Sequence, residues 1–320
     1  MKKIVLNNKD LHVAPIGLGT VNAGLVWNGP DADNLFDLFM DLGGNLIDTA
    51  HVYSDWIKPE RARSERAIGE WFARSKKRDK IVLVTKGGHP DITATMPNMH
   101  NSRMKKEDMQ IDLDGSLNRL QTDYIDIYLY HRDDTNQPVE ALIDVMEEFV
   151  QQGKIRYYGC SNWSTDRILA ADRYCKETRK CGFVTNQMLF NLGLHHMKPL
   201  LDDTMISMDE KMYQYHKENP FNLAMPYMGA CNGFFHRYLE KGDETVSKSP
   251  YYTPGNIVVA KQVKKLMDKY EASATQIVLG FFFAQEFQCL PLIGVSSQSQ
   301  LIDAMKTMDI PFIAKDFVFA

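Results

Sequence analysis

Short apolar runs alternate eight times with stretches of helical periodicity along this chain, and this alternation limits its possible folds. The apolar runs are Pro15 to Gly19, Leu46 to Thr49, Ile81 to Thr85, Ile125 to Tyr130, Ile155 to Gly159, Val184 to Asn186, Asn222 to Met225 and Leu290 to Ile293. The helical stretches are Asp31 to Leu42, Glu65 to Arg74, Lys105 to Leu120, Val139 to Gln152, Thr165 to Lys180, Thr204 to Lys217, a pair from Ile257 to Glu286, and one after Ser299. Eight such repeats favour a closed (β/α)8 TIM barrel over an open sheet. A length of 320 residues suits one barrel, so we predict a single domain over residues 1–320.

Two further features complete the expected architecture. The strand-like segments Ile4 to Leu6 and Leu11 to Val13, on either side of the polar turn Asn7 to Asp10, predict an N-terminal β-hairpin, which we expect to plug one end of the barrel. Three connections after strands are longer than a barrel needs: Gly87 to Asn101, Leu192 to Met208 and Asn232 to Thr253. Such loops share one rim and could cover a pocket, although solvated connections are the alternative.

Composition excludes several classes of function. A net charge of -4, spread along the chain, provides no field for nucleic acid or a membrane surface. We find no apolar segment long enough for a signal peptide or a membrane span. The five cysteines are odd in number and form no CxxC pair, which argues against zinc and disulfides and favours the cytoplasm.

Four polar residues with complementary chemistry follow three successive predicted strands. Asp48 and Tyr53 follow the second strand, Lys86 the third and His131 the fourth. Barrel enzymes build their active sites at the carboxyl ends of the strands, so these side chains are expected to meet. Taken singly, Asp48 could cap a helix, Lys86 could be solvated and His131 could be a core histidine, but together they favour a catalytic group.

The chain resembles the aldo-keto reductase family along nearly its whole length. The residues that carry the resemblance are Gly17-Leu18-Gly19-Thr20, Asp48-Thr49-Ala50 with Tyr53, Lys86, Ser116 to Leu120, His131, Gly153 to Arg156, Cys160-Ser161-Asn162, Asn186-Gln187 and Gly294. The resemblance implies that Asp48, Tyr53, Lys86 and His131 form a catalytic tetrad. It also implies reversible hydride transfer between a nicotinamide and an aldehyde, a ketone or the matching alcohol, without a metal.

Carbonyl reduction fits these residue types, because charge develops on the oxygen as hydride arrives at carbon. Tyr53 would donate the proton. A lysine at ~4 Å and an effective dielectric of ~20 contributes about 4 kcal/mol, which would bring the pKa of a tyrosine near 7. Asp48 would orient Lys86 and offset part of this effect, and His131 would orient the carbonyl.

The resemblance also implies where the cofactor binds. No GxGxxG motif follows a strand, so the dinucleotide is expected along the barrel rim instead of in a Rossmann domain. Ser161, Asn162 and Gln187 would bind the nicotinamide carboxamide, and Gly19 and Thr20 would lie against the cofactor, beside Asp48. Alternatively, Asn162 could cap the following helix.

Two departures from the family pattern concern the cofactor. Where many relatives place an aromatic ring on the nicotinamide, this chain has Ala224-Met225-Pro226-Tyr227, so Met225 takes the position of the ring unless Tyr227 compensates. The stretch from Gly294 to Ala304 lacks the usual cation for the 2′-phosphate of NADP, and Ala304 replaces an asparagine. Ser296, Ser297 and Gln300 remain as polar groups. We therefore expect NADP(H) with weak discrimination against NAD(H).

The substrate is a small molecule that the sequence specifies poorly. Trp27, Trp56 and His89 follow strand ends and are the candidate wall residues, together with Trp163 and Phe190. His89 or Arg132 could bind a hydroxyl-rich or anionic substrate, such as a sugar-derived carbonyl. Two other functions stay open: a cofactor-binding regulatory subunit that senses redox state, and a lyase or epimerase that uses bound NAD.

Overall fold

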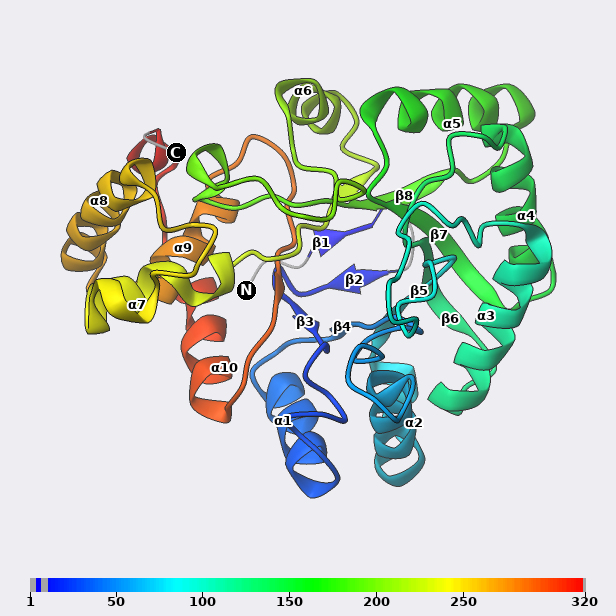
Figure 1. Cartoon of the computed structure of the whole chain (residues 1–320), viewed down its shortest axis with the longest axis horizontal. Coiled ribbons are helices and arrows are strands. Elements are labelled where there is room, and N and C mark those ends of the chain that lie inside the picture. The colour runs from blue at the N-terminus through cyan, green and yellow to red at the C-terminus, as the bar shows by residue number, and fades with distance from the viewer. Residues whose placement is uncertain (1–3, 7–10, 319–320) are drawn as a thin grey trace.

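A computed structural model describes residues 4–6 and 11–318, and their strands form the predicted barrel (Figure 1). Eight parallel strands are hydrogen-bonded in the order β10-β3-β4-β5-β6-β7-β8-β9. They are β3 (Gly17–Gly19), β4 (Leu46–Asp48), β5 (Val82–Gly87), β6 (Ile125–Tyr130), β7 (Ile155–Ser161), β8 (Phe183–Gln187), β9 (Leu223–Ala224) and β10 (Leu292–Ile293). The Leu290 amide donates to the Ala224 carbonyl oxygen at 2.9 Å, which joins the segment before β10 to β9 and closes the barrel. The (β/α)8 prediction is confirmed.

The strands were recognisable because a parallel sheet covered by helices buries both of its faces. Every residue of β5 and of β6 is buried. The sequences of such strands are nearly continuous apolar runs, without the alternation of apolar and polar residues seen in half-exposed strands.

The predicted N-terminal hairpin is present and closes one end of the barrel. Strands β1 (Ile4–Val5) and β2 (His12–Val13) pair antiparallel and lie across the barrel in Figure 1. Leu6, Leu11 and Val13 are buried in the apolar cluster that fills the barrel interior. The turn predicted at 7–10 lies outside the described residues.

Helices form the outer layer, and each presents an apolar stripe to the barrel. In α1, the buried residues Ala32, Leu35, Phe36 and Phe39 recur at spacings of three and four. The helices are α1 (Pro30–Asp41), α2 (Arg63–Ser75), α3 (Lys106–Leu120), α4 (Val139–Gln151), α5 (Thr165–Thr178), α6 (Glu210–Glu218), α7 (Phe234–Lys241), α8 (Pro254–Tyr270), α9 (Ala274–Phe283) and α10 (Gln298–Met305). Short 3-10 turns occur at Arg78–Lys80, Leu194–His196, Cys231–Gly233, Asp243–Thr245, Lys306–Asp309 and Ala314–Phe317.

Two differences from the predicted elements exceed a few residues. Helix α6 begins at Glu210 instead of Thr204, because the Asp209 side chain accepts a hydrogen bond from the Met212 amide and caps the helix there. The connection Asn232 to Thr253 was predicted to be a loop, but it contains α7. Phe234 and Phe235 are fully buried and fix this helix against the outer layer.

Candidate active site

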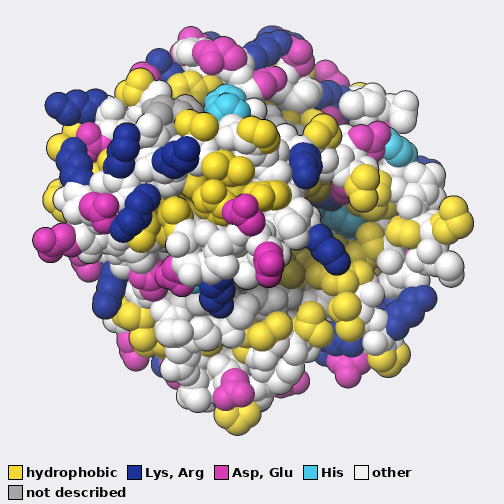
Figure 2. Space-filling model, turned by 60° about the vertical axis from the view of Figure 1, so that its left-hand side comes forward, with side chains coloured by type: hydrophobic (Ala, Val, Ile, Leu, Met, Phe, Trp, Pro, Cys, Tyr) yellow, Lys and Arg dark blue, Asp and Glu magenta, His cyan; other side chains and the backbone are white. Residues whose placement is uncertain are grey.

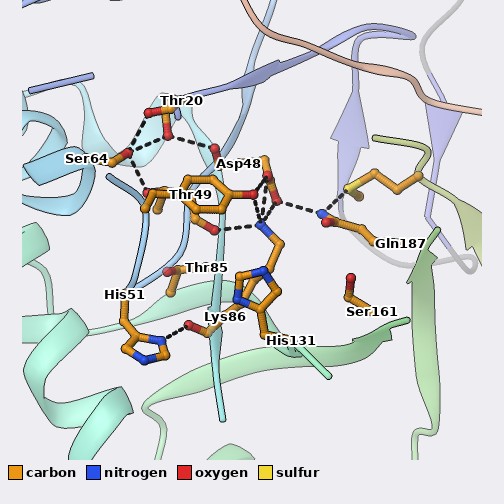
Figure 3. Close-up of polar contacts among 12 residues, drawn as sticks. Thr20, Asp48, Thr49, His51, Ser64, Thr85, Lys86, His131, Ser161 and Gln187 are labelled. Atoms are coloured by element: carbon orange, nitrogen blue, oxygen red, sulfur yellow. Dashed lines mark hydrogen bonds and ion pairs between the residues drawn. The ribbon is translucent and has the colours of Figure 1, made fainter. Parts of the chain in front are cut away.

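The four predicted catalytic residues meet at the carboxyl ends of β4, β5 and β6 (Figure 3). Lys86 is the centre of the group: its Nζ lies 2.8 Å from the Tyr53 hydroxyl oxygen and 2.8 Å from the carboxylate of Asp48. It also donates to the Thr49 carbonyl oxygen at 2.8 Å. Lys86 and Asp48 are each 1% exposed, so the ion pair is shielded from solvent. The geometry therefore holds a phenol beside a buried cation.

The electrostatics of Tyr53 differ from the simple expectation of a pKa near 7. Burial and the negative charge of Asp48 raise the pKa of Tyr53 well above the usual 10.0. Burial also lowers the pKa of Lys86, and the charge of Asp48 offsets part of that effect. Because the Asp48 carboxylate lies 3.2 Å from the phenol oxygen and the Lys86 ammonium 2.8 Å from it, the lysine does not act on the phenol alone. In the free protein, Tyr53 is a protonated phenol at neutral pH.

His131 faces Tyr53, with ring centroids 6.0 Å apart. Burial is the main factor that lowers the pKa of His131 well below 6.5, and the neighbouring His89 and Arg132 act in the same direction. The imidazole is therefore neutral and carries one N–H. Its Nδ1 has no hydrogen-bond partner among the described residues. A proton on Nε2 leaves His131 able to donate one hydrogen bond.

A cavity of about 450 Å³ opens beside Tyr53 and His131. Its lining includes the predicted residues Gly19, Asp48, Tyr53, His131, Ser161, Asn162, Gln187, Tyr227 and Gly294. Arg132, which was considered for substrate binding, also lines it. Val21, Met205 and Met228 line it too and were not among the predicted residues, because their positions carry no family motif. Figure 2 shows a hollowed surface bordered by hydrophobic side chains, with a histidine visible within it.

Two amide side chains at this cavity are already held by the protein. Gln187 donates to Asp48 at 2.6 Å. The side-chain oxygen of Asn162 accepts from the Tyr227 hydroxyl at 2.6 Å and from the Ile206 amide at 3.1 Å. Asn162 has a φ of 61°, a left-handed conformation that asparagine tolerates better than most residues. Asn162 stands before α5 but does not cap it, since the N-cap residue is Ser164.

The placement of Met225 does not fit the predicted contact with the nicotinamide. Met225 follows β9 and is fully buried in the apolar cluster of the barrel interior, where its sulfur accepts a contact from Gln187 at 3.2 Å. Tyr227, two residues on, lines the cavity instead. Thr20 is also fully buried and lines neither this cavity nor the next, so its contact with the cofactor stays a prediction.

A second cavity, of about 790 Å³, continues from the first. Ala230, Asn232, Gly233 and Gly294 line both. The predicted residues Ser296, Ser297 and Gln300 lie in the second, where Ser297 caps α10. Arg237 of α7 lines it too and is its one lysine or arginine among the described residues. Arg237 thus brings a cation to this cavity from a helix that was predicted to be a loop.

The three predicted substrate residues do not line the catalytic cavity. Trp27 is 3% exposed and donates to the Val295 carbonyl oxygen at 3.1 Å. Trp56 is 49% exposed at the surface. His89 is buried behind His131, with ring centroids 4.5 Å apart, and burial lowers its pKa to about 3. Trp163 and Phe190 are buried as well.

Arg132 lines the cavity but is already paired. It forms an ion pair with Asp202 at 2.9 Å and donates to Thr204 at 2.9 Å. Both partners belong to the loop before α6, so Arg132 fastens that loop to the end of β6.

Two further findings concern ions and membranes. Among residues 4–6 and 11–318, no group of three or more His, Cys, Asp or Glu side chains is arranged to hold a metal ion. Over the same residues, the structure has no helix with the length and apolar character needed to cross a membrane.

Comparison with known proteins places these features in a wider context. A model of the Aldo/keto reductase family matches residues 15–318. The uncharacterized oxidoreductase YrpG of Bacillus subtilis is 27% identical over 317 residues, which is 97% of this chain and 92% of that protein. An NADP(+) aryl-alcohol dehydrogenase of Phanerodontia chrysosporium is 31% identical over 59% of this chain and 51% of its own length. A norsolorinic acid reductase of Aspergillus flavus is 32% identical over 50% of this chain, a match that spans 42% of that protein.

Proposed function

Since this chain belongs to the Aldo/keto reductase family and is an NAD(P)H-dependent oxidoreductase, we propose that Tyr53 is its proton donor in the reduction of a small carbonyl compound. The observation that carries the proposal is the position of Lys86 Nζ, 2.8 Å from both the Tyr53 hydroxyl and Asp48. A purely structural salt bridge between Lys86 and Asp48 would not need a third partner, the phenol of Tyr53, that faces a cavity.

The two joined cavities fit an extended dinucleotide. Gly294 lines both, and a Cβ added there would meet no atom within 4 Å, so this glycine leaves the passage between them open. Ser161, Asn162 and Gln187 would hold the nicotinamide end, and Tyr227 would cover its ring. Ser296, Ser297, Gln300 and Arg237 would hold the other end, where a helix N-terminus also favours an anion.

Residues of the chain would supply the proton that the carbonyl oxygen takes up. When bound, the reduced nicotinamide supplies hydride to the carbonyl carbon. Tyr53 gives its proton to the carbonyl oxygen, and Lys86 compensates the charge left on the phenolate. His131, which is neutral, donates its single N–H to the same oxygen and orients it. Solvent returns a proton to Tyr53, and the reverse sequence oxidises the alcohol.

The cavity favours an apolar or aromatic carbonyl over a sugar-derived one. Val21, Met205, Met228 and Leu292 contribute apolar side chains to the wall, and the charge of Arg132 is paired with Asp202. Relatives named for aryl alcohols and for norsolorinic acid agree with this choice.

The test is a panel of aromatic, aliphatic and sugar aldehydes with NADPH and NADH, using wild type and Tyr53→Phe. We expect turnover by wild type, fastest with the aromatic aldehydes, and none by Tyr53→Phe, which should bind NADPH as wild type does. Wild-type protein that binds NADPH but reduces no member of the panel would fit a regulatory subunit instead. Conversion of substrate without added nicotinamide would fit a lyase or epimerase.

A further inference from the structure

A buried cluster of three hydroxyls lies directly behind the tetrad. Ser64, the second residue of α2, has its Oγ 2.7 Å from the hydroxyl of Thr20 and 2.7 Å from the hydroxyl of Thr49. All three residues are 0% exposed. Figure 3 shows the cluster beside Asp48, on the side away from Gln187.

The hydrogen count fixes how this cluster is connected. Thr20 donates its hydroxyl proton to the Asp48 carbonyl oxygen at 2.8 Å. Ser64 donates its one proton towards Thr20, whose carbonyl oxygen lies 2.9 Å away. Ser64 therefore accepts from Thr49, and it is the one hydrogen-bond partner of the Thr49 hydroxyl among the described residues. Each donor in the cluster is used once.

The cluster acts on the two groups that hold Lys86. Thr20 fixes the backbone of Asp48, whose carboxylate pairs with Lys86. Ser64 fixes Thr49, whose carbonyl oxygen accepts from Lys86 Nζ at 2.8 Å. Ser64 thus links the start of α2 to both residues that place the ammonium beside Tyr53.

The next residue of α2 supports the same strand ends. Glu65 is 0% exposed and accepts from the Thr85 hydroxyl at 2.7 Å, next to Lys86 in β5. Arg119 of α3 pairs with the other oxygen of Glu65 at 2.7 Å. The start of α2 is therefore anchored and gives Ser64 a fixed position.

We propose that Ser64 is a positioning residue of the active site, which holds Lys86 against Tyr53 through the hydroxyl of Thr49. The inference rests on the proposed reduction by Tyr53. Removing the Ser64 hydroxyl leaves a buried O–H of Thr49 without its acceptor. The Thr49 side chain then no longer ties its backbone to α2, so the Thr49 carbonyl that accepts from Lys86 Nζ is held less precisely. Displacements of this kind lower the rate of a chemical step far more than they weaken binding.

The experiment compares Ser64→Ala and Thr49→Val with wild type, using NADPH and whichever aldehyde of the panel wild type reduces fastest. Thr49→Val keeps the shape of the side chain and loses only the hydroxyl. We expect each variant to lower kcat about 10- to 100-fold, with KM and the Kd for NADPH nearly unchanged. Alcohol oxidation should begin to rise at a higher pH, because the phenolate loses support from Lys86. The double variant should be no slower than the slower single one.

Two variants separate positioning from general stability. Thr49→Ser restores the hydroxyl and should recover most of the kcat lost in Thr49→Val. Tyr215→Phe removes another buried hydroxyl, which donates to Asp172 at 2.8 Å in the outer layer, and should lower Tm without changing kcat or the pH profile. If Ser64→Ala does not fold, Thr49→Val decides.

The proposal is overturned if the folded variants keep wild-type kcat and pH profiles, or if Thr49→Ser is as slow as Thr49→Val. A wild-type protein without turnover would instead contradict the proposed function.

Discussion

At the scale of single residues, Tyr53 shows that the net charge around a catalytic group matters more than its nearest partner. Lys86 alone would favour the phenolate, but Asp48 contacts the same phenol at 3.2 Å and burial penalises the charged form. The free protein therefore keeps Tyr53 as an acid. In the proposed mechanism, reduction consumes the proton of Tyr53 and uses the protonated form directly, whereas oxidation first requires loss of that proton.

The two directions should consequently respond to pH in opposite ways. Because the pKa of Tyr53 is raised above 10.0, we expect kcat for reduction to stay level through neutral pH and to fall only in alkaline solution. The kcat for alcohol oxidation should rise over the same alkaline range. Steady-state rates from pH 6 to 10.5 would measure both. A reduction rate that already falls by half near pH 7 would contradict the raised pKa.

Arg237 provides a second prediction at this scale. As the one lysine or arginine lining the second cavity among the described residues, it is the expected contact for the 2′-phosphate. Arg237→Ala should raise the KM for NADPH about tenfold, as the loss of one charge-assisted hydrogen bond requires, and leave the KM for NADH unchanged. Lys306→Ala, beyond that cavity, is the matched control. Equal loss for both cofactors would place Arg237 elsewhere on the dinucleotide.

At the scale of elements, α6 contains a buried histidine that makes folding sensitive to acid. His216 is 1% exposed, donates from Nδ1–H to the Asn222 carbonyl oxygen at 3.1 Å, and packs against Phe287. Burial lowers its pKa from 6.5 to about 4. The unfolded chain therefore binds a proton at a pH where the folded protein does not.

The sign of the effect follows from this lowered pKa. The neutral, buried His216 makes its full contribution to the free energy of unfolding above pH 6.5. As the pH falls towards 4, this contribution decreases by about 3 kcal/mol. Urea unfolding at several pH values should show the loss, and His216→Phe should reduce it. The exposed His195 is a control: His195→Gln should leave the pH slope as it is. Equal slopes for wild type and His216→Phe would show that other groups dominate.

A substitution in the N-terminal hairpin is expected to lower the stability of the protein without changing its activity. Leu11 is 3% exposed and packs inside the barrel, at the end opposite the tetrad. Leu11→Ala should lower the free energy of unfolding by about 2–5 kcal/mol, while kcat/KM at 25 °C stays unchanged. Val258→Ala, at a site on α8 that is 57% exposed, should change neither quantity. A loss of kcat/KM in folded Leu11→Ala would show that the hairpin influences the site.

At the scale of the whole molecule, the sequence predicted what depends on pattern and missed what depends on the neighbours of a side chain. The eight strands and the meeting of Asp48, Tyr53, Lys86 and His131 followed from apolar runs and the parallel arrangement. The direction in which side chains point after the short strand β9 could not be predicted from the pattern. Met225 was therefore expected to face the cavity, which Tyr227 lines instead. That residues 1–320 form one domain stays a prediction.

The same limit explains the other misplaced residues. Trp27 and His89 both follow strand ends, yet one binds a carbonyl of a distant segment, Val295, and the other packs behind His131. Helix α7 was missed because glycine and polar residues surround its short apolar core. Neither long-range partners nor burial of such a helix is visible in local spacing.

The hydrogen bonds of Asn162 lead us to expect a fixed order of binding for the cofactor and the carbonyl compound. Its side-chain oxygen is occupied by Tyr227 and by the Ile206 amide, and Ile206 is adjacent to Met205 on the cavity wall. A cofactor carboxamide that donates to the Asn162 side-chain oxygen would replace Tyr227 or the Ile206 amide there. It would thereby change the cavity wall before a carbonyl compound binds. We expect an ordered sequence, cofactor first, in which NADPH alone changes the hydrogen exchange of the Ile206 amide. An aldehyde alone should leave that exchange unaltered.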